Sequence, residues 1–117
     1  MLKFLLSNGN IKVYYHDWVK NFINNKVARK EVLYDKIKHI VHLLSLNIPP
    51  PQKLYKKLEN DIWEIRYHDI RIFCYRKNNK LFLFNIMVKK RDKIGNIEIE
   101  RNRKLLLETK MEVLKIL

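Results

Sequence analysis

Residues 62–88 read IWEIRYHDIRIFCYRKNNKLFLFNIMV, and this stretch decides the fold. It is rich in β-branched and aromatic residues, which favour extended strands. Two short polar breaks, at 68–69 and 77–80, divide it into strands expected at 62–67, 70–76 and 81–88. Because connections this short join neighbouring antiparallel strands, the sequence predicts a three-stranded antiparallel meander.

Side chains along these strands alternate between the two faces of the sheet. On the first strand, one face carries Trp63, Ile65 and Tyr67, and the other carries Glu64 and Arg66. On the second strand, one face carries Ile70, Ile72 and Cys74, and the other carries Arg71, Phe73 and Tyr75. We therefore expect one face to pack on helices and the other to display arginines beside aromatic rings.

Helices are expected before and after this meander. Apolar residues at helical spacing predict two helices over about 17–46, with Asp17 as the candidate N-cap. The run Pro49-Pro50-Pro51 ends the second helix, because proline lacks a backbone donor. A last helix is expected over about 98–117, where Leu107, Met111 and Leu114 form an apolar stripe that packs against the domain or a partner.

The N-terminal residues complete the predicted fold. Two short β-prone runs, 2–6 and 11–15, flank a turn with the pair Asn8-Gly9, which favours a hairpin, although the second run could lead straight into a helix. A chain of 117 residues has room for one compact core. The predicted fold is α+β in a single domain over 1–117, with an N-terminal strand or hairpin, two helices, one antiparallel sheet and a C-terminal helix.

The charge of the chain favours a polyanionic partner. It has 25 Lys and Arg against 12 Asp and Glu, a formal charge of +13. Basic residues outnumber acidic ones 8 to 3 over 1–52, 15 to 7 over 53–104 and 2 to 2 over 105–117. Since basic contacts to phosphates release counterions, nucleic acid is favoured over an anionic membrane surface. The alternative is that these lysines only keep the protein surface solvated and bind no polyanion.

Several classes of protein are disfavoured. Cys74 is the only cysteine, which excludes an intramolecular disulfide and suits the reducing cytoplasm. No run approaches the roughly 20 apolar residues of a membrane span, and the N-terminus lacks a signal-peptide pattern. His39 and His42 have no cysteine and no third ligand nearby in the sequence, so neither a metal site nor a cofactor is expected.

A family resemblance rests on three segments. Residues 56–66, KKLENDIWEIR, resemble the K-x-L…W-E-L-R strand of the phage-derived HigB-like branch of the RelE superfamily of toxins. Ile70-Arg71-Ile72-Phe73 is similar to that family's Y-R-I-F segment. Val88-Lys89-Lys90 followed by Glu98-Ile99-Glu100 resembles its F-x-K-K…E-I-E ending. The resemblance covers about residues 50–105, and it implies a RelE-like fold.

Four positions depart from the family pattern. Asn85-Ile86-Met87 stands where the family has h-x-F, Gly95 where it has proline, and Asn102 where it has alanine. A tyrosine that some members carry beyond the lysine pair falls near Asn96. These departures leave an altered or weakened chemistry open.

The resemblance implies a toxin that enters the ribosome and cuts messenger RNA without a metal. Its implied partner is a cognate antitoxin, a helix-turn-helix protein of the HigA type. Attack of a 2′-hydroxyl on the adjacent phosphate builds negative charge, which fixed cations stabilise, and we expect Arg66, Arg71 and Lys90 in that role. Proton transfer requires a general base and acid. His68 is the nearest candidate in the sequence, and Lys57 is an alternative.

Further RNA contacts are expected along the same strands, from Lys56, Lys57, Phe73, Tyr75, Lys89, Arg91 and Lys93, with the aromatic rings stacking on bases. Structural alternatives stay open: Arg66 could pair with Glu64 or Asp69, and His68 could be a solvent-facing turn residue. The lysines after Val88 could protect an edge strand, and the aromatic rings could belong to the core. Two functions compete with the nuclease: the protein could be a non-catalytic RNA-binding module, or a subunit whose basic face binds an acidic protein partner.

Overall fold

The computed structural model describes residues 1–90 and 95–116, which form six strands and three helices. In chain order these are β1 (Leu2–Asn8), β2 (Ile11–His16), α1 (Asp17–Lys26), α2 (Lys30–Ser45), β3 (Tyr55–Glu59), β4 (Ile62–Tyr67), β5 (Ile70–Lys77), β6 (Lys80–Val88) and α3 (Asn96–Ile116). Among these described helices, none is long and apolar enough to span a membrane.

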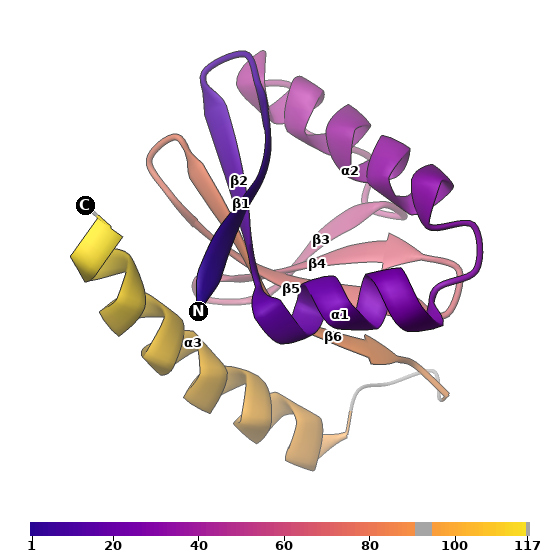
Figure 1. The fold of residues 1–117 in the computed structure, drawn as a ribbon, viewed down its shortest axis with the longest axis vertical. Helices are drawn as coiled ribbons and strands as arrows, with labels where there is room; N and C mark the ends of the chain where they lie inside the picture. The colour runs from indigo at the N-terminus through magenta and orange to yellow at the C-terminus, as the bar shows by residue number, and fades with distance from the viewer. Residues whose placement is uncertain (91–94, 117) are drawn as a thin grey trace.

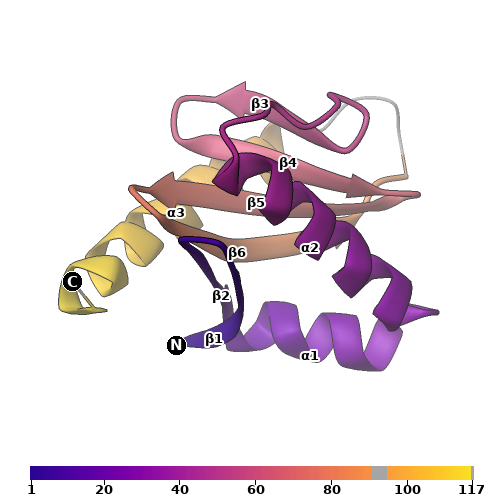
Figure 2. The same ribbon diagram turned by 90° about the horizontal axis from the view of Figure 1, so that it is seen from above.

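The six strands form one mixed sheet in the order β1-β2-β6-β5-β4-β3. Figure 2 shows β3 to β6 side by side, with α2 crossing them. β2 runs parallel to β6, with Lys12 opposite Lys80, and the other neighbouring pairs are antiparallel. The prediction of a three-stranded antiparallel sheet is therefore wrong, although the fold is α+β. The prediction missed strand β3 at one edge of the sheet. It also missed the pairing of β2 with β6, which joins the N-terminal hairpin to the meander on its other side.

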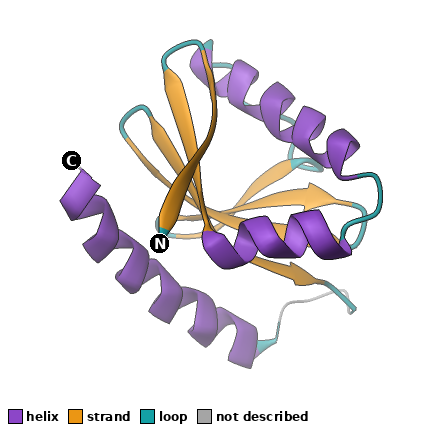
Figure 3. Ribbon diagram, viewed as in Figure 1, coloured by secondary structure: helices purple, strands orange, loops and turns teal. Residues whose placement is uncertain are grey.

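Helices cover both faces of the sheet (Figures 1 and 3). α1 and α2 pack on one face, where Ile23 and Ile37 join the strand residues Ile65 and Ile72 in one buried cluster. α3 packs on the other face, where a second cluster contains Phe73, Tyr75, Phe82, Phe84, Leu106 and Val113. The expectation that one face displays aromatic rings to solvent is wrong, because α3 covers them.

The buried side of α3 differs from the predicted stripe. Leu107, Met111 and Leu114 are exposed, and the helix instead buries Asn102, Leu106, Thr109 and Val113, which follow one another in steps of four, three and four residues. Asn85 Nδ2 donates a hydrogen bond to Asn102 Oδ1, and both side chains are buried. The two asparagines that depart from the family pattern thus satisfy each other inside the core, between β6 and α3.

Two local features join the N-terminal hairpin to the helices. Gly9 has a φ of +58°, and a Cβ atom there would lie 2.9 Å from Ser45 Cβ, so glycine allows both the turn and its close approach to the end of α2. The N-cap of α1 is His16 rather than the predicted Asp17, because the His16 side chain accepts a hydrogen bond from the Trp18 N–H. Asp17 is the first helical residue, where a carboxylate also suits the helix dipole.

Candidate functional site

The β4–β5 turn lies on the right of Figure 1. A cationic hollow borders this turn. Its volume is about 310 Å³, and its lining residues are Lys36, Lys53, Leu54, Arg66, Tyr67, His68 and Arg71. None of these seven residues is acidic, whereas four are lysines or arginines. We call this feature the arginine hollow. Its electrostatic potential favours an anionic ligand.

Strand pairing places the two arginines of the hollow together. Arg66 on β4 and Arg71 on β5 are direct partners in the antiparallel register, on either side of the His68-Asp69 turn. Side chains at such positions lie on the same face and about 5 Å apart at their Cβ atoms. Like charges opposite each other destabilise a sheet, so this arrangement requires a compensating anion.

That anion is the carboxylate of Glu64, which is 1% exposed. Arg66 Nε donates a hydrogen bond to Glu64 Oε1 at 2.7 Å. Arg71 Nε lies 3.4 Å from the same oxygen, which is an ion-pair distance without hydrogen-bond geometry. The pairing of Arg66 with Glu64, left open by the sequence, is thus present. Glu64 Oε2 is buried and has no hydrogen-bond partner among the described residues.

The β4–β5 turn holds Arg71 from its other end. Arg71 Nη1 donates hydrogen bonds to the carbonyl oxygens of His68 at 2.6 Å and Ile70 at 2.9 Å. The arginine side chain is only 14% exposed, so its guanidinium is fixed in place before any ligand arrives. His68 itself is exposed, has a φ of +52°, and packs edge-on against the Tyr67 ring at 4.5 Å between centroids.

The end of β6 lies beside this turn. Lys89 N donates a hydrogen bond to the Asp69 carbonyl oxygen at 2.7 Å, which places the lysine pair next to the arginine hollow. Lys90 is exposed and does not line the hollow. Of the four predicted catalytic residues, the structure therefore brings Arg66, His68 and Arg71 together, with Lys90 at the margin. Arg91 and Lys93, predicted to bind RNA, lie outside the described residues.

Two lysines of the hollow were missed by sequence reasoning. Lys36 is an exposed residue of α2, and Lys53 lies in the connector between α2 and β3. Nothing in the local pattern separates Lys36 from the other exposed lysines of its helix. Lys53 lies only three residues before the Lys56-Lys57 pair, for which RNA contact was predicted. This closeness in the chain was the one sequence feature that could have drawn attention to Lys53.

The remaining predicted RNA contacts lie elsewhere. Lys56 and Lys57 are on β3 and line a different hollow. Phe73 is fully buried and Tyr75 is 9% exposed, so both belong to the core beneath α3 and offer no ring face for a base. Burial also raises the pKa of the Cys74 thiol well above its ordinary value, which makes this cysteine unreactive.

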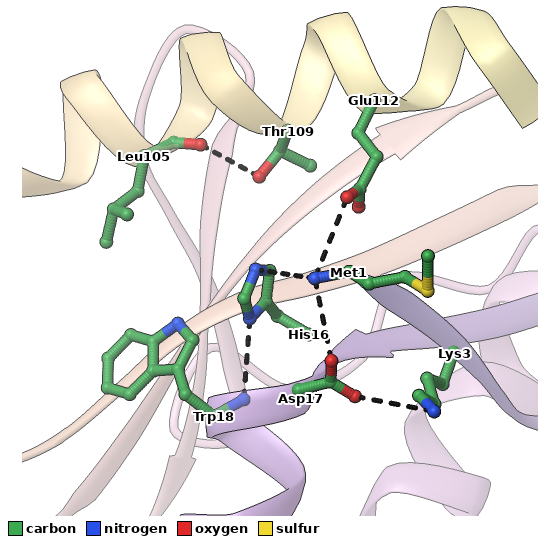
Figure 4. Close-up of polar contacts among 8 residues, drawn as sticks. All are labelled: Met1, Lys3, His16, Asp17, Trp18, Leu105, Thr109 and Glu112. Carbon is green, nitrogen blue, oxygen red and sulfur yellow. Dashed lines mark hydrogen bonds and ion pairs between the residues drawn. The ribbon is translucent and has the colours of Figure 1, made fainter.

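A second polar cluster connects α3 to the start of α1 (Figure 4). The Met1 nitrogen lies 3.1 Å from His16 Nε2, 3.6 Å from Asp17 Oδ2 and 3.7 Å from Glu112 Oε1. Burial and the neighbouring Met1 ammonium lower the pKa of His16 below 6.5. A protonated ring would also lose the acceptor nitrogen that caps α1.

This lowered pKa predicts a loss of stability in weak acid. The unfolded chain binds a proton at His16 more readily than the folded protein, so the free energy of unfolding falls as the pH drops through 6.5. His16→Asn keeps an N-cap acceptor but cannot titrate. Thermal unfolding between about pH 7.5 and pH 5 should show a weaker pH dependence in His16→Asn than in wild type. Equal slopes in the two proteins, with His39→Asn as the control, would contradict the assignment.

Comparison with models of known protein families gives a match. The family model described as phage-derived protein Gp49-like (DUF891) matches residues 27–106. This range runs from the end of α1 into α3 and includes every residue that lines the arginine hollow, together with Glu64. A search of the curated proteins finds no match.

Proposed function

Because the chain belongs to the Gp49-like family of phage-derived proteins, within the RelE/HigB-type toxin superfamily, we propose that it is the toxin of a toxin–antitoxin pair and cuts messenger RNA on the ribosome. The family is associated with toxins of such pairs. We further propose that the protein belongs to the HigB-like branch of this superfamily. Its antitoxin would be a helix-turn-helix protein of the HigA type, and the pair would act in the cytoplasm.

The arginine hollow supports the proposal most strongly. It gathers four cations and one histidine, none of its seven described lining residues is acidic, and its two arginines are held by Glu64 and by turn carbonyls. Such fixed donors stabilise negative charge without reorganising as the reaction proceeds. A scissile phosphate bound here would meet Arg66 and Arg71 from the sheet, with Lys36 and Lys53 opposite them.

The proposed reaction needs no metal. The RNA 2′-hydroxyl gives its proton to a general base and attacks the adjacent phosphorus. The bond from phosphorus to the 5′ oxygen breaks, and that oxygen takes a proton from a general acid, which leaves a 2′,3′-cyclic phosphate and a 5′-hydroxyl. Charge that builds on the non-bridging oxygens is stabilised by Arg66 and Arg71. His68 is the proposed proton-transfer group, because it is the histidine that lines the hollow and its ring is exposed. Lys57, the other candidate, does not line this hollow.

Two of the departures from the family pattern, Asn85 and Asn102, lie away from the proposed reaction site. Asn85 and Asn102 pair with each other in the core between β6 and α3. Neither of them lines the arginine hollow. These two substitutions therefore affect how α3 is held rather than the proposed reaction site.

Induction in a host cell tests the proposal. Wild type should slow growth and produce new 5′ ends within translated messages, and a message without its start codon should stay intact. The double variant Arg71→Ala with Lys90→Ala should do neither, at equal protein level. If wild type leaves growth and messages unchanged, the nuclease proposal fails. If the double variant is as toxic as wild type, the site assignment fails instead.

A further inference from the structure

A second hollow of about 490 Å³ lies on the face that α2 covers, near the far end of β4. The end of α2 and the proline-rich connector supply its apolar wall through Leu44, Ile48 and Pro50. Its volume is in the range of sites for small ligands, and its lining residues do not include Arg66, Arg71 or His68. We call it the tryptophan hollow.

Two stacked rings border the tryptophan hollow. Tyr55 on β3 and Trp63 on β4 lie 4.7 Å apart between ring centroids, with an interplanar angle of 12°. Tyr55 is 3% exposed, whereas Trp63 is partly exposed. The buried ring backs the indole and holds it in one orientation. A fixed and partly exposed indole is a ready platform for stacking another flat ring.

Three cations surround these rings. Lys56, Lys57 and Arg76 line the hollow and are exposed, and none of the described residues that line it is acidic. Within the described part of the chain, none of the three forms an ion pair with a carboxylate. Arg76 Nε donates a hydrogen bond to the Asn78 carbonyl oxygen at 3.2 Å. Because this acceptor is neutral, it does not compensate the positive charge of the arginine.

An apolar wall, a stacking platform and three unpaired cations together fit a flat aromatic group that carries a negative charge. We propose that the tryptophan hollow binds one unpaired nucleotide of single-stranded RNA, with its base against Trp63 and its phosphate near Lys57 and Arg76. Base stacking on aromatic side chains together with contacts to cations is the general mode of single-strand recognition. The inference rests on the proposed function, because it assigns this nucleotide to the RNA that is cut in the arginine hollow.

The fold allows one RNA strand to reach both hollows. α2, the 49–57 segment and β4 each contribute residues to both of them. Trp63 and Tyr67, which lines the arginine hollow, point to the same face of β4 and are four positions apart, which corresponds to about 13 Å along a strand. A nucleotide held at Trp63 would therefore lie close to the cleaved phosphate and would help to position it.

Binding measurements test the inference separately from cleavage. The probe is a ten-nucleotide single-stranded RNA with 2′-O-methyl groups, which cannot be cut by 2′-hydroxyl attack. Trp63→Leu should weaken its binding by about 10-fold to 100-fold. The variant Lys57→Ala with Arg76→Ala changes only exposed side chains, and it should lower the salt dependence of binding by about one to two phosphate contacts. Trp18→Phe, in α1, is the matched aromatic control and should bind as wild type does.

Each outcome decides the inference. If Trp63→Leu folds and both variants bind the RNA as tightly as wild type, with an unchanged salt dependence, the tryptophan hollow is not an RNA site, and the cleavage proposal is unaffected. If an acidic peptide that contains tyrosine binds wild type and needs Trp63 while the RNA does not, the hollow is a protein site and the inference is overturned. If Trp63→Leu is unfolded, the double cation variant decides alone. Failure of wild type to cut messages in cells would reject the nuclease but would leave this binding result standing.

Discussion

Replacement of Arg71 by alanine is expected to lower the rate of messenger RNA cleavage by about 10²-fold to 10³-fold, the usual effect of removing one fixed donor to a developing anion. The guanidinium is already held by the His68 and Ile70 carbonyls, so its contact with phosphate costs little further ordering. Its loss should therefore act on the chemical step rather than only on RNA binding. Single-turnover cleavage on programmed ribosomes measures this step directly.

Two comparisons separate the effect of Arg71 from a general loss of charge. Lys12→Ala removes one positive charge at the opposite end of the sheet, where Lys12 N donates to the Asn79 carbonyl oxygen, and it should cleave as wild type does. Arg71→Lys keeps the charge but loses the planar fork, so its rate should lie between those of wild type and the alanine variant. If Arg71→Ala cleaves as fast as Lys12→Ala while remaining folded, Arg71 has no part in catalysis.

Replacement of Glu64 by alanine is expected to give the largest loss of stability. Its carboxylate is buried and separates two arginines that the strand register places opposite each other. Removing one member of a buried ion pair typically costs about 3–5 kcal/mol. Since Arg66 and Arg71 keep 27% and 14% of their side-chain surface exposed, we expect a value near the lower limit, about 3 kcal/mol. Urea unfolding measures the difference from wild type.

Glu59→Ala is the matched control for this prediction. Glu59 also pairs with an arginine, Arg103, but that pair is at the surface, so its removal should cost far less stability than removal of Glu64. Glu64→Gln keeps the shape of the side chain and one acceptor oxygen, so its loss of stability should lie between the two alanine variants. Equal unfolding free energies for Glu59→Ala and Glu64→Ala would show that the buried carboxylate does not hold the arginines.

The sequence by itself was sufficient for the parts of the molecule that depend on neighbours in the chain. The helices over 17–46, the C-terminal helix and the strands of residues 62–88 follow from local periodicity, prolines and short turns. Because the His68-Asp69 turn sets the register, the juxtaposition of Arg66 and Arg71 was also within reach of the sequence. The sequence resemblance to RelE/HigB-type toxins was also read from local segments, and the family match over residues 27–106 places the chain in that superfamily.

The tertiary structure decided what depends on residues far apart in the chain. Alternation along a strand shows which side chains share a face, but it does not show what covers that face, so the sequence left open whether Phe73 and Tyr75 lie in the core or face RNA, and only the position of α3 decided for the core. The short strand β3 pairs with its chain neighbour β4 across the Asn60-Asp61 turn, and the sequence reasoning missed this local hairpin. The β2–β6 pairing depends on long-range contacts that leave no periodic signal. For the same reason, the convergence of Lys36 and Lys53 on the arginines, and the formation of a second hollow by α2 with Trp63, became evident only when the chain was folded.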